Sequence, residues 1–66
     1  MVWAAVNKEG KEAIYTSKPI RGINILENKE TWLLTNIYAH YAFVPKGTIK
    51  RLIGKDLTWK DEPVKI

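Results

Sequence analysis

The stretch VWAAVNKEGKEAIYT, residues 2–16, places two short apolar runs on either side of a polar turn. The runs cover residues 2–6 and 12–16, and their length and composition are typical of β-strands. Gly10 lies between them and can adopt the positive φ that closes a short hairpin. The stretch therefore predicts an antiparallel β-hairpin.

The register of this hairpin depends on the length of its loop. Four loop residues pair Trp3 with Ile14, whereas three pair Trp3 with Tyr15. A shift by one residue moves every side chain of a strand to the opposite face, so the two registers differ in what they bury. The sequence leaves both open. In either register both faces carry apolar groups, although an antiparallel sheet in a monomer commonly keeps one face in water.

A second hairpin is expected after an interruption of the strand pattern. Pro19 lacks the amide that a strand ladder needs, and Gly22 loosens the chain, so the segment around them is expected to lie between strands. The runs 23–26 and 31–35 are then predicted as two strands joined by residues 27–30. The sequence thus predicts two successive hairpins.

Residues 36–44, NIYAHYAFV, form the longest apolar and aromatic run of the chain. Helical spacing fits part of this run. Its aromatic and β-branched content and the stop at Pro45 favour a strand instead. Alternate positions of that strand, which include Tyr41 and Phe43, are then expected to share one face.

A short helix is predicted at residues 48–53. Thr48 suits the N-cap, and Gly54 lies where a helix ends in a left-handed residue. Three apolar residues share one helical face at spacing i, i+3 and i+4, namely Ile49, Leu52 and Ile53. Lys50 and Arg51 then point away from this face. Because two turns of helix are not stable alone in water, the apolar face is expected to dock on a sheet.

The remaining residues return to extended character, with Trp59 in one short strand and Val64 and Ile66 in another. The expected fold is α+β and mostly β, as a single domain over residues 1–66. It has four to five short antiparallel strands in a small curled sheet or barrel, with one short helix at about 48–53 before the last strands. This order of elements resembles that of SH3-like small barrels, although no sequence motif of that family is present.

Size and composition limit what such a chain can be. A chain of 66 residues hides only about 60% of the surface of its unfolded form, so its core is thin. It has no cysteine, so disulfides and thiolate metal sites are excluded. Residues 1–12 lack the pattern of a signal peptide, and no apolar run reaches the ~20 residues of a membrane span. A cytoplasmic protein without a membrane partner is expected.

The residue types that carry catalysis are scarce. His40 is the single histidine and Ser17 the single serine, and nothing in their spacing indicates that they meet. Asp61 and Glu62 are adjacent, so their side chains diverge in a strand. His40 with scattered carboxylates has no metal-ligand spacing. The sequence predicts a protein that is not an enzyme and has no cofactor, no metal and no catalytic residues.

The positive charge of the chain is concentrated in residues 45–55, PKGTIKRLIGK. This segment holds four of the eleven basic residues and none of the seven acidic ones, which leaves the rest of the chain neutral. The candidate contacts for a nucleic acid are the basic residues of this segment and one nearby aromatic residue: Lys46, Lys50, Arg51, Lys55 and Trp59. Weak, sequence-independent nucleic-acid binding is therefore the alternative function. The other interpretation of these charges is the solvated face of a docked helix.

Seven aromatic residues are more than a core this small is expected to bury. Interfaces between proteins are enriched in tryptophan and tyrosine. The leading prediction is therefore a small non-enzymatic binding or accessory module that acts through protein–protein contacts and forms a homodimer. Its candidate interface is Trp3, Tyr38 and His40, where His40 is either a pH-sensitive interface group or a half-buried strand residue.

Overall fold

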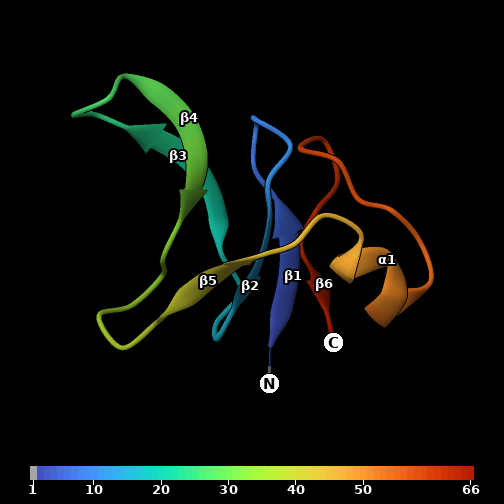
Figure 1. Ribbon diagram of the computed structural model, residues 1–66. Helices are drawn as coiled ribbons and strands as arrows, with labels where there is room; N and C mark the ends of the chain where they lie inside the picture. The colour runs from blue at the N-terminus through green and yellow to red at the C-terminus, as the bar shows by residue number, and fades with distance from the viewer. Residues whose placement is uncertain (1) are drawn as a thin grey trace.

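The structure is a computed structural model that describes residues 2–66, shown in Figure 1. Its elements follow in chain order: β1 (Trp3–Val6), β2 (Glu12–Tyr15), β3 (Ile20–Asn24), β4 (Lys29–Leu33), β5 (Tyr41–Val44), α1 (Thr48–Ile53) and β6 (Val64–Lys65). The strands pair into a four-stranded antiparallel sheet of order β5-β2-β1-β6 and a two-stranded sheet of β3 and β4. The expected mostly-β fold with one short helix before the last strand is confirmed. A single closed barrel is not found in residues 2–66, because the strands form two separate sheets.

The first hairpin adopts the register with the shorter loop. Trp3 pairs with Tyr15, and the backbone amide of Asn7 donates to the carbonyl of Lys11 at 2.9 Å. The Asn7 side chain also accepts the amide of Lys11 at 2.9 Å. Gly10 has a φ of 88°, as the sequence predicts. The asparagine side chain and the positive φ together fix a tight turn and thereby the register.

Both faces of the central strands β1 and β2 are covered within the same chain. Figure 1 shows the β3–β4 hairpin on one side of the four-stranded sheet and α1 on the other. The buried residues between the sheet and α1 are Ala4, Val6 and Ile49. Those between the sheet and the hairpin are Ala5, Ala13, Tyr15 and Trp32. The small alanines of β1 and β2 let both covering layers approach closely, which accounts for strands that are apolar on both faces.

Helix α1 has the predicted bounds and ends at Gly54 with a φ of 83°. The prediction of Thr48 as the N-cap is wrong, because Gly47 occupies that position and Thr48 is the first helical residue. The free amides of this end are bound by a strand instead. The amides of Gly47 and Ile49 donate to the Glu12 carboxylate at 2.7 and 2.8 Å. A carboxylate of β2 therefore caps the helix in place of a local side chain.

The predicted apolar face of α1 is only partly buried. Ile49 is 1% exposed and Ile53 is half-buried, whereas Leu52 is 52% exposed. At 100° per residue, Leu52 lies about 60° to one side of Ile49 and Ile53 about 40° to the other. A helix of two turns touches the sheet along a narrow line, so the flanking Leu52 remains in solvent.

The second hairpin starts earlier than the sequence predicts. Ile20 already belongs to β3, and Gly22 lies within this strand rather than between strands. A side chain at Gly22 would come within 2.3 Å of Leu33 on the partner strand, so glycine makes room for that leucine. The turn lies at residues 25–28, where Asn24 accepts two turn amides at 3.0 and 3.2 Å and Asn28 has a φ of 51°. These two asparagines set the turn.

The predicted strand at 36–44 is correct only in its second half. Residues 41–44 form β5, whereas a turn occupies the region of Asn36 to His40. The Asn36 side chain accepts the amide of Tyr38 at 2.8 Å, and its carbonyl accepts the amide of Ala39 at 3.2 Å. Local hydrogen bonds of an asparagine therefore override the strand preference of the aromatic residues.

The prediction of a strand at Trp59 is also wrong. The Asp61 carboxylate accepts the Thr58 amide at 2.7 Å, and the Asp61 amide donates to the Thr58 carbonyl at 3.0 Å. Trp59 consequently lies in a turn. The last strand, β6, pairs with β1 and follows Pro63 as expected. Among residues 2–66, no helix has the length and apolar character needed to cross a membrane.

Candidate interaction surface

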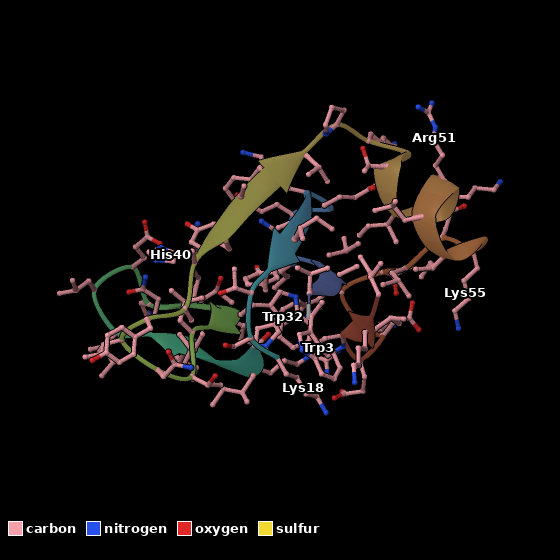
Figure 2. All side chains as sticks on the ribbon, turned by 90° about the horizontal axis from the view of Figure 1, so that it is seen from below. Trp3, Lys18, Trp32, His40, Arg51 and Lys55 are labelled. Carbon is pink, nitrogen blue, oxygen red and sulfur yellow. The ribbon has the colours of Figure 1, made fainter. Side chains whose placement is uncertain are left out.

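Strand β5 is the free edge that has the least protection against pairing. It borders the four-stranded sheet, and in Figure 2 its ribbon follows the outline of the molecule with no other described segment beyond it. The sequence of β5 is YAFV, without charge or proline. The other border strands differ: β6 has two residues including Lys65, β3 contains Arg21, and β4 contains Lys29 and Glu30. Charged and very short edges resist pairing with a further strand, so β5 is the most exposed to it.

The backbone of β5 offers hydrogen-bonding groups to solvent at alternate residues. The amide of Thr16 donates to the carbonyl of His40 at 3.0 Å, so these two residues form a bonded pair. Bonded and non-bonded pairs alternate along an antiparallel ladder. Ala42, two residues further, therefore bonds to β2. The amides and carbonyls of Tyr41 and Phe43 point outward, and they have no hydrogen-bond partner in residues 2–66.

Three aromatic rings stand side by side next to this edge. We call Tyr15, Tyr41 and Phe43 the aromatic ladder. The rings of Tyr15 and Tyr41 stack with centroids 5.5 Å apart, and Phe43 meets Tyr41 edge-on at 5.5 Å. Tyr15 is buried, but Tyr41 and Phe43 are 50% and 55% exposed. About half of the surface of each outer residue is thus available to a partner, with the Lys11 ammonium 5.6 Å from the centroid of the Phe43 ring.

A groove of about 470 Å³ lies between the aromatic ladder and β4, and Leu33 and Leu34 line its other side. The Lys8 ammonium and the Glu30 carboxylate of this groove are 2.9 Å apart. The hydrogen bond from Lys8, and then its positive charge, lower the pKa of the Glu30 carboxyl. Burial, followed by the nearby Tyr41, raises the pKa of Tyr15 to about 12. The groove therefore combines an apolar aromatic wall with an ion pair and a hydroxyl that stays protonated.

The structure separates the three residues of the predicted interface. Tyr38 is 79% exposed in the turn before β5, and His40 is exposed where β5 begins. Trp3 is half-buried, and the Lys18 ammonium lies 5.5 Å from the centroid of its ring. Figure 2 shows Trp3 beside Lys18 and far from His40. Only Tyr38 and His40 therefore border the β5 edge.

Tyr41 and Phe43 were not among the interface residues predicted from the sequence. Their position on alternate residues before Pro45 predicted that they share a face. Their exposure follows from the order of strands in the sheet, with β5 at its border. The order of strands in the sheet depends on contacts between distant segments, so no local sequence pattern predicts it.

The basic residues of the segment 45–55 are all exposed, but they do not form one row. In Figure 2, Arg51 and Lys55 point in opposite directions from the end of the molecule that carries α1. The Lys50 ammonium lies 4.0 Å from the Asp56 carboxylate, with both side chains largely in solvent. Ion pairs this exposed contribute little to stability. The charges are therefore free to meet an anion, but on more than one side of the helix.

Trp59, the predicted partner for an unpaired base, is engaged within the protein. The Arg21 guanidinium lies 5.0 Å from the Trp59 ring centroid and 4.7 Å from that of Trp32. It also donates to the Glu62 carboxylate at 2.6 Å and to the Asp61 carbonyl at 2.9 Å. Trp59 thus fastens the C-terminal segment to the β3–β4 hairpin, and one ring face is already covered.

A search for related proteins found no family model, no curated protein and no solved structure that matches this chain.

Proposed function

We propose that this chain is a small non-enzymatic binding module that acts through protein–protein contacts, with the β5 edge and the aromatic ladder as its binding surface. The single observation that carries the proposal is the uncharged edge of β5 beside two half-exposed rings. Two expectations from the sequence belong to the same proposal, namely a cytoplasmic location and the SH3-like order of elements.

The chemistry of this surface suits an extended polypeptide. An incoming strand can hydrogen-bond with the outward groups of Tyr41 and Phe43 and so extend the sheet, as in other cases of strand addition. Each such bond contributes about 0.5–1.5 kcal/mol net. Main-chain bonds are independent of the partner's sequence, so selectivity has to come from the two rings and from the groove beside them.

A peptide selection tests this function. Ten-residue peptides chosen from a random display library are expected to shift the NMR signals of the Tyr41 and Phe43 amides in the folded protein. Methylation of the peptide backbone nitrogens on the bonding side should abolish these shifts. Peptides that bind only elsewhere, or a selection that yields no binder, would contradict the proposal.

A second candidate function is weak, sequence-independent binding to nucleic acid. The observation in its favour is the exposure of Lys46, Lys50, Arg51 and Lys55, which carry the excess charge of the chain. A groove of about 710 Å³ next to Trp59 adds Lys8 and Lys60 to Lys46. Glu12 and Asp56 line the same groove and offset part of this charge. A steep loss of binding with increasing salt concentration would distinguish this function from peptide binding at β5.

A further inference from the structure

We infer that the strand added at the β5 edge is β5 of a second copy of this chain, paired antiparallel about a two-fold axis at Ala42. The inference rests on the proposed function and names its partner. Two-fold pairing places one surface against itself, so the edge must be complementary to its own copy.

The outward groups of β5 satisfy this condition. Tyr41 and Phe43 are the two residues whose amides and carbonyls face away from β2. In the antiparallel arrangement, Tyr41 of one copy lies opposite Phe43 of the other, and Ala42 lies opposite itself. Each of the two bonded pairs exchanges both of its main-chain hydrogen bonds, so the ladder closes with about four bonds. The dimer then has one continuous sheet through both copies.

The flanking residues select this register over its neighbours. A shift in one direction brings in Ala39, which is 7% exposed and whose amide already donates to the carbonyl of Asn36. A shift in the other direction brings in Pro45, which has no amide hydrogen. The carbonyl of Pro45 already accepts the amide and hydroxyl of Thr48 at 3.1 and 2.6 Å. Only the register centred on Ala42 pairs both Tyr41 and Phe43 with free groups of the other copy, whereas each neighbouring register keeps a single such pair.

The side chains of β5 also fit a second copy. Directly opposite residues of a sheet share a face, so Tyr41 meets Phe43 of the other copy and the two aromatic ladders become continuous. On the opposite face, Ala42 meets Ala42, and small side chains there allow close approach. The strand carries no charge, so no like charges are placed opposite each other within the ladder.

The amount of buried surface predicts a weak dimer. An aromatic side chain buries roughly 150–250 Å² in full, so four half-exposed rings add on the order of 400 Å². A stable interface needs about 1,200–2,000 Å². Each copy also has a net charge of +4, and this repulsion is screened by salt. Self-association is therefore expected at high protein concentration and should strengthen with salt, whereas binding to nucleic acid weakens with salt.

Sedimentation equilibrium of the full chain tests the inference, from roughly 10 µM to 1 mM protein and at two salt concentrations. The mean mass is expected to rise from the monomer value of 7.6 kDa toward twice that value. Phe43→Lys should weaken association at least tenfold, since it places a charge on the edge. Leu52→Lys is the matched control, because it adds the same charge at an exposed apolar residue of the helix and should leave association unchanged.

Amide hydrogen exchange of the unmodified protein provides a second measurement that does not depend on how a variant folds. Protection of the Tyr41 and Phe43 amides should increase with protein concentration, while protection of Ala42 should change little because it already bonds to β2. A monomer at 1 mM, or equal weakening by Phe43→Lys and Leu52→Lys, overturns the inference. If selected peptides still bind at β5 in that case, the proposed function stands without it; if they do not, both are wrong.

Discussion

Arg21 contacts aromatic rings, a carboxylate and backbone carbonyls at the same time. Its guanidinium contacts both rings of the Trp32–Trp59 pair, whose centroids are 5.1 Å apart in an edge-on arrangement. It also donates to three groups of the C-terminal segment, the Glu62 carboxylate and the carbonyls of Trp59 and Asp61. The planar group combines stacking with a fixed fork of donors. The sequence prediction put Arg21 in a break between two strands. Its contacts could not be predicted, because its partners lie about forty residues away along the chain and become neighbours only in the folded protein.

We predict that Arg21→Lys destabilises the protein by about 1–3 kcal/mol, since lysine keeps the charge but loses the planar stack and most of the hydrogen bonds. Urea unfolding measures this change. Lys50→Ala is the control and should remain within about 0.5 kcal/mol, as exposed substitutions usually do. Equal effects of the two substitutions would show that the guanidinium geometry does not matter.

Tyr15 predicts a loss of stability in alkaline solution. Its pKa is raised to about 12 in the folded protein, from 10.0 for the free group. Between these values the unfolded chain loses the proton and the folded chain keeps it, so the free energy of unfolding falls as pH rises from 10 to 12. Tyr15→Phe should lower this slope relative to the unmodified protein. An unchanged slope in denaturant titrations across this range would contradict the prediction, since lysines contribute equally to both proteins.

At the scale of elements, helix α1 shows which features of a helix local sequence patterns predict and which they do not. Its bounds and its end at Gly54 follow from capping and spacing, and both are confirmed. The burial of Leu52 and the cap at Thr48 were predicted wrongly, because the docking line and the Glu12 carboxylate belong to other elements. The second hairpin is similar. Its two hydrophobic runs predicted a pair of strands, but the ends of these strands depend on the turn that the Asn24 side chain stabilises and on the space that Gly22 leaves for Leu33.

The corrected docking face changes the expected mutational pattern of α1. Ile49→Ala should cost about 2–5 kcal/mol, through lost burial and the cavity left behind. Leu52→Ala should cost less than about 1 kcal/mol, because half of its side chain is already in solvent. Thermal or urea unfolding of the two variants gives the comparison. A larger cost for Leu52→Ala would mean that the helix is rotated relative to this structure.

The exposed basic residues of the segment 45–55 give a prediction for nucleic-acid binding if all four of them reach phosphates. Four phosphate contacts give a log–log salt slope of about −3.6, so affinity should fall on the order of a hundredfold between 50 and 200 mM salt. Replacing both Lys50 and Arg51 by Glu should abolish binding to a mixed single-stranded oligonucleotide without unfolding the protein. Lys18→Glu with Lys65→Glu changes the net charge equally on another part of the surface and should retain most binding. If the unmodified protein binds no oligonucleotide at 50 mM salt, this function is excluded.

At the scale of the whole molecule, the two apolar faces of the strands have an internal explanation. Such strands are unusual in a monomer, but here the β3–β4 hairpin covers one face and α1 the other. The part of the four-stranded sheet that neither layer covers is its border at β5. The turn before β5 places Tyr38 and His40 near that border, whereas Trp3 packs against the buried cluster on the hairpin side. The order of the strands decides this outcome, and it depends on contacts between distant segments.

The Glu12 cap on α1 predicts the order in which the elements fold. Glu12 precedes the amides that it binds by 35 and 37 residues. A helix of two turns does not persist alone, so α1 forms only after the first hairpin has brought this carboxylate into place. A synthetic peptide of residues 45–58 should therefore show no helical circular dichroism. In refolding of the full chain, exchange protection of the α1 amides should appear later than that of β1 and β2.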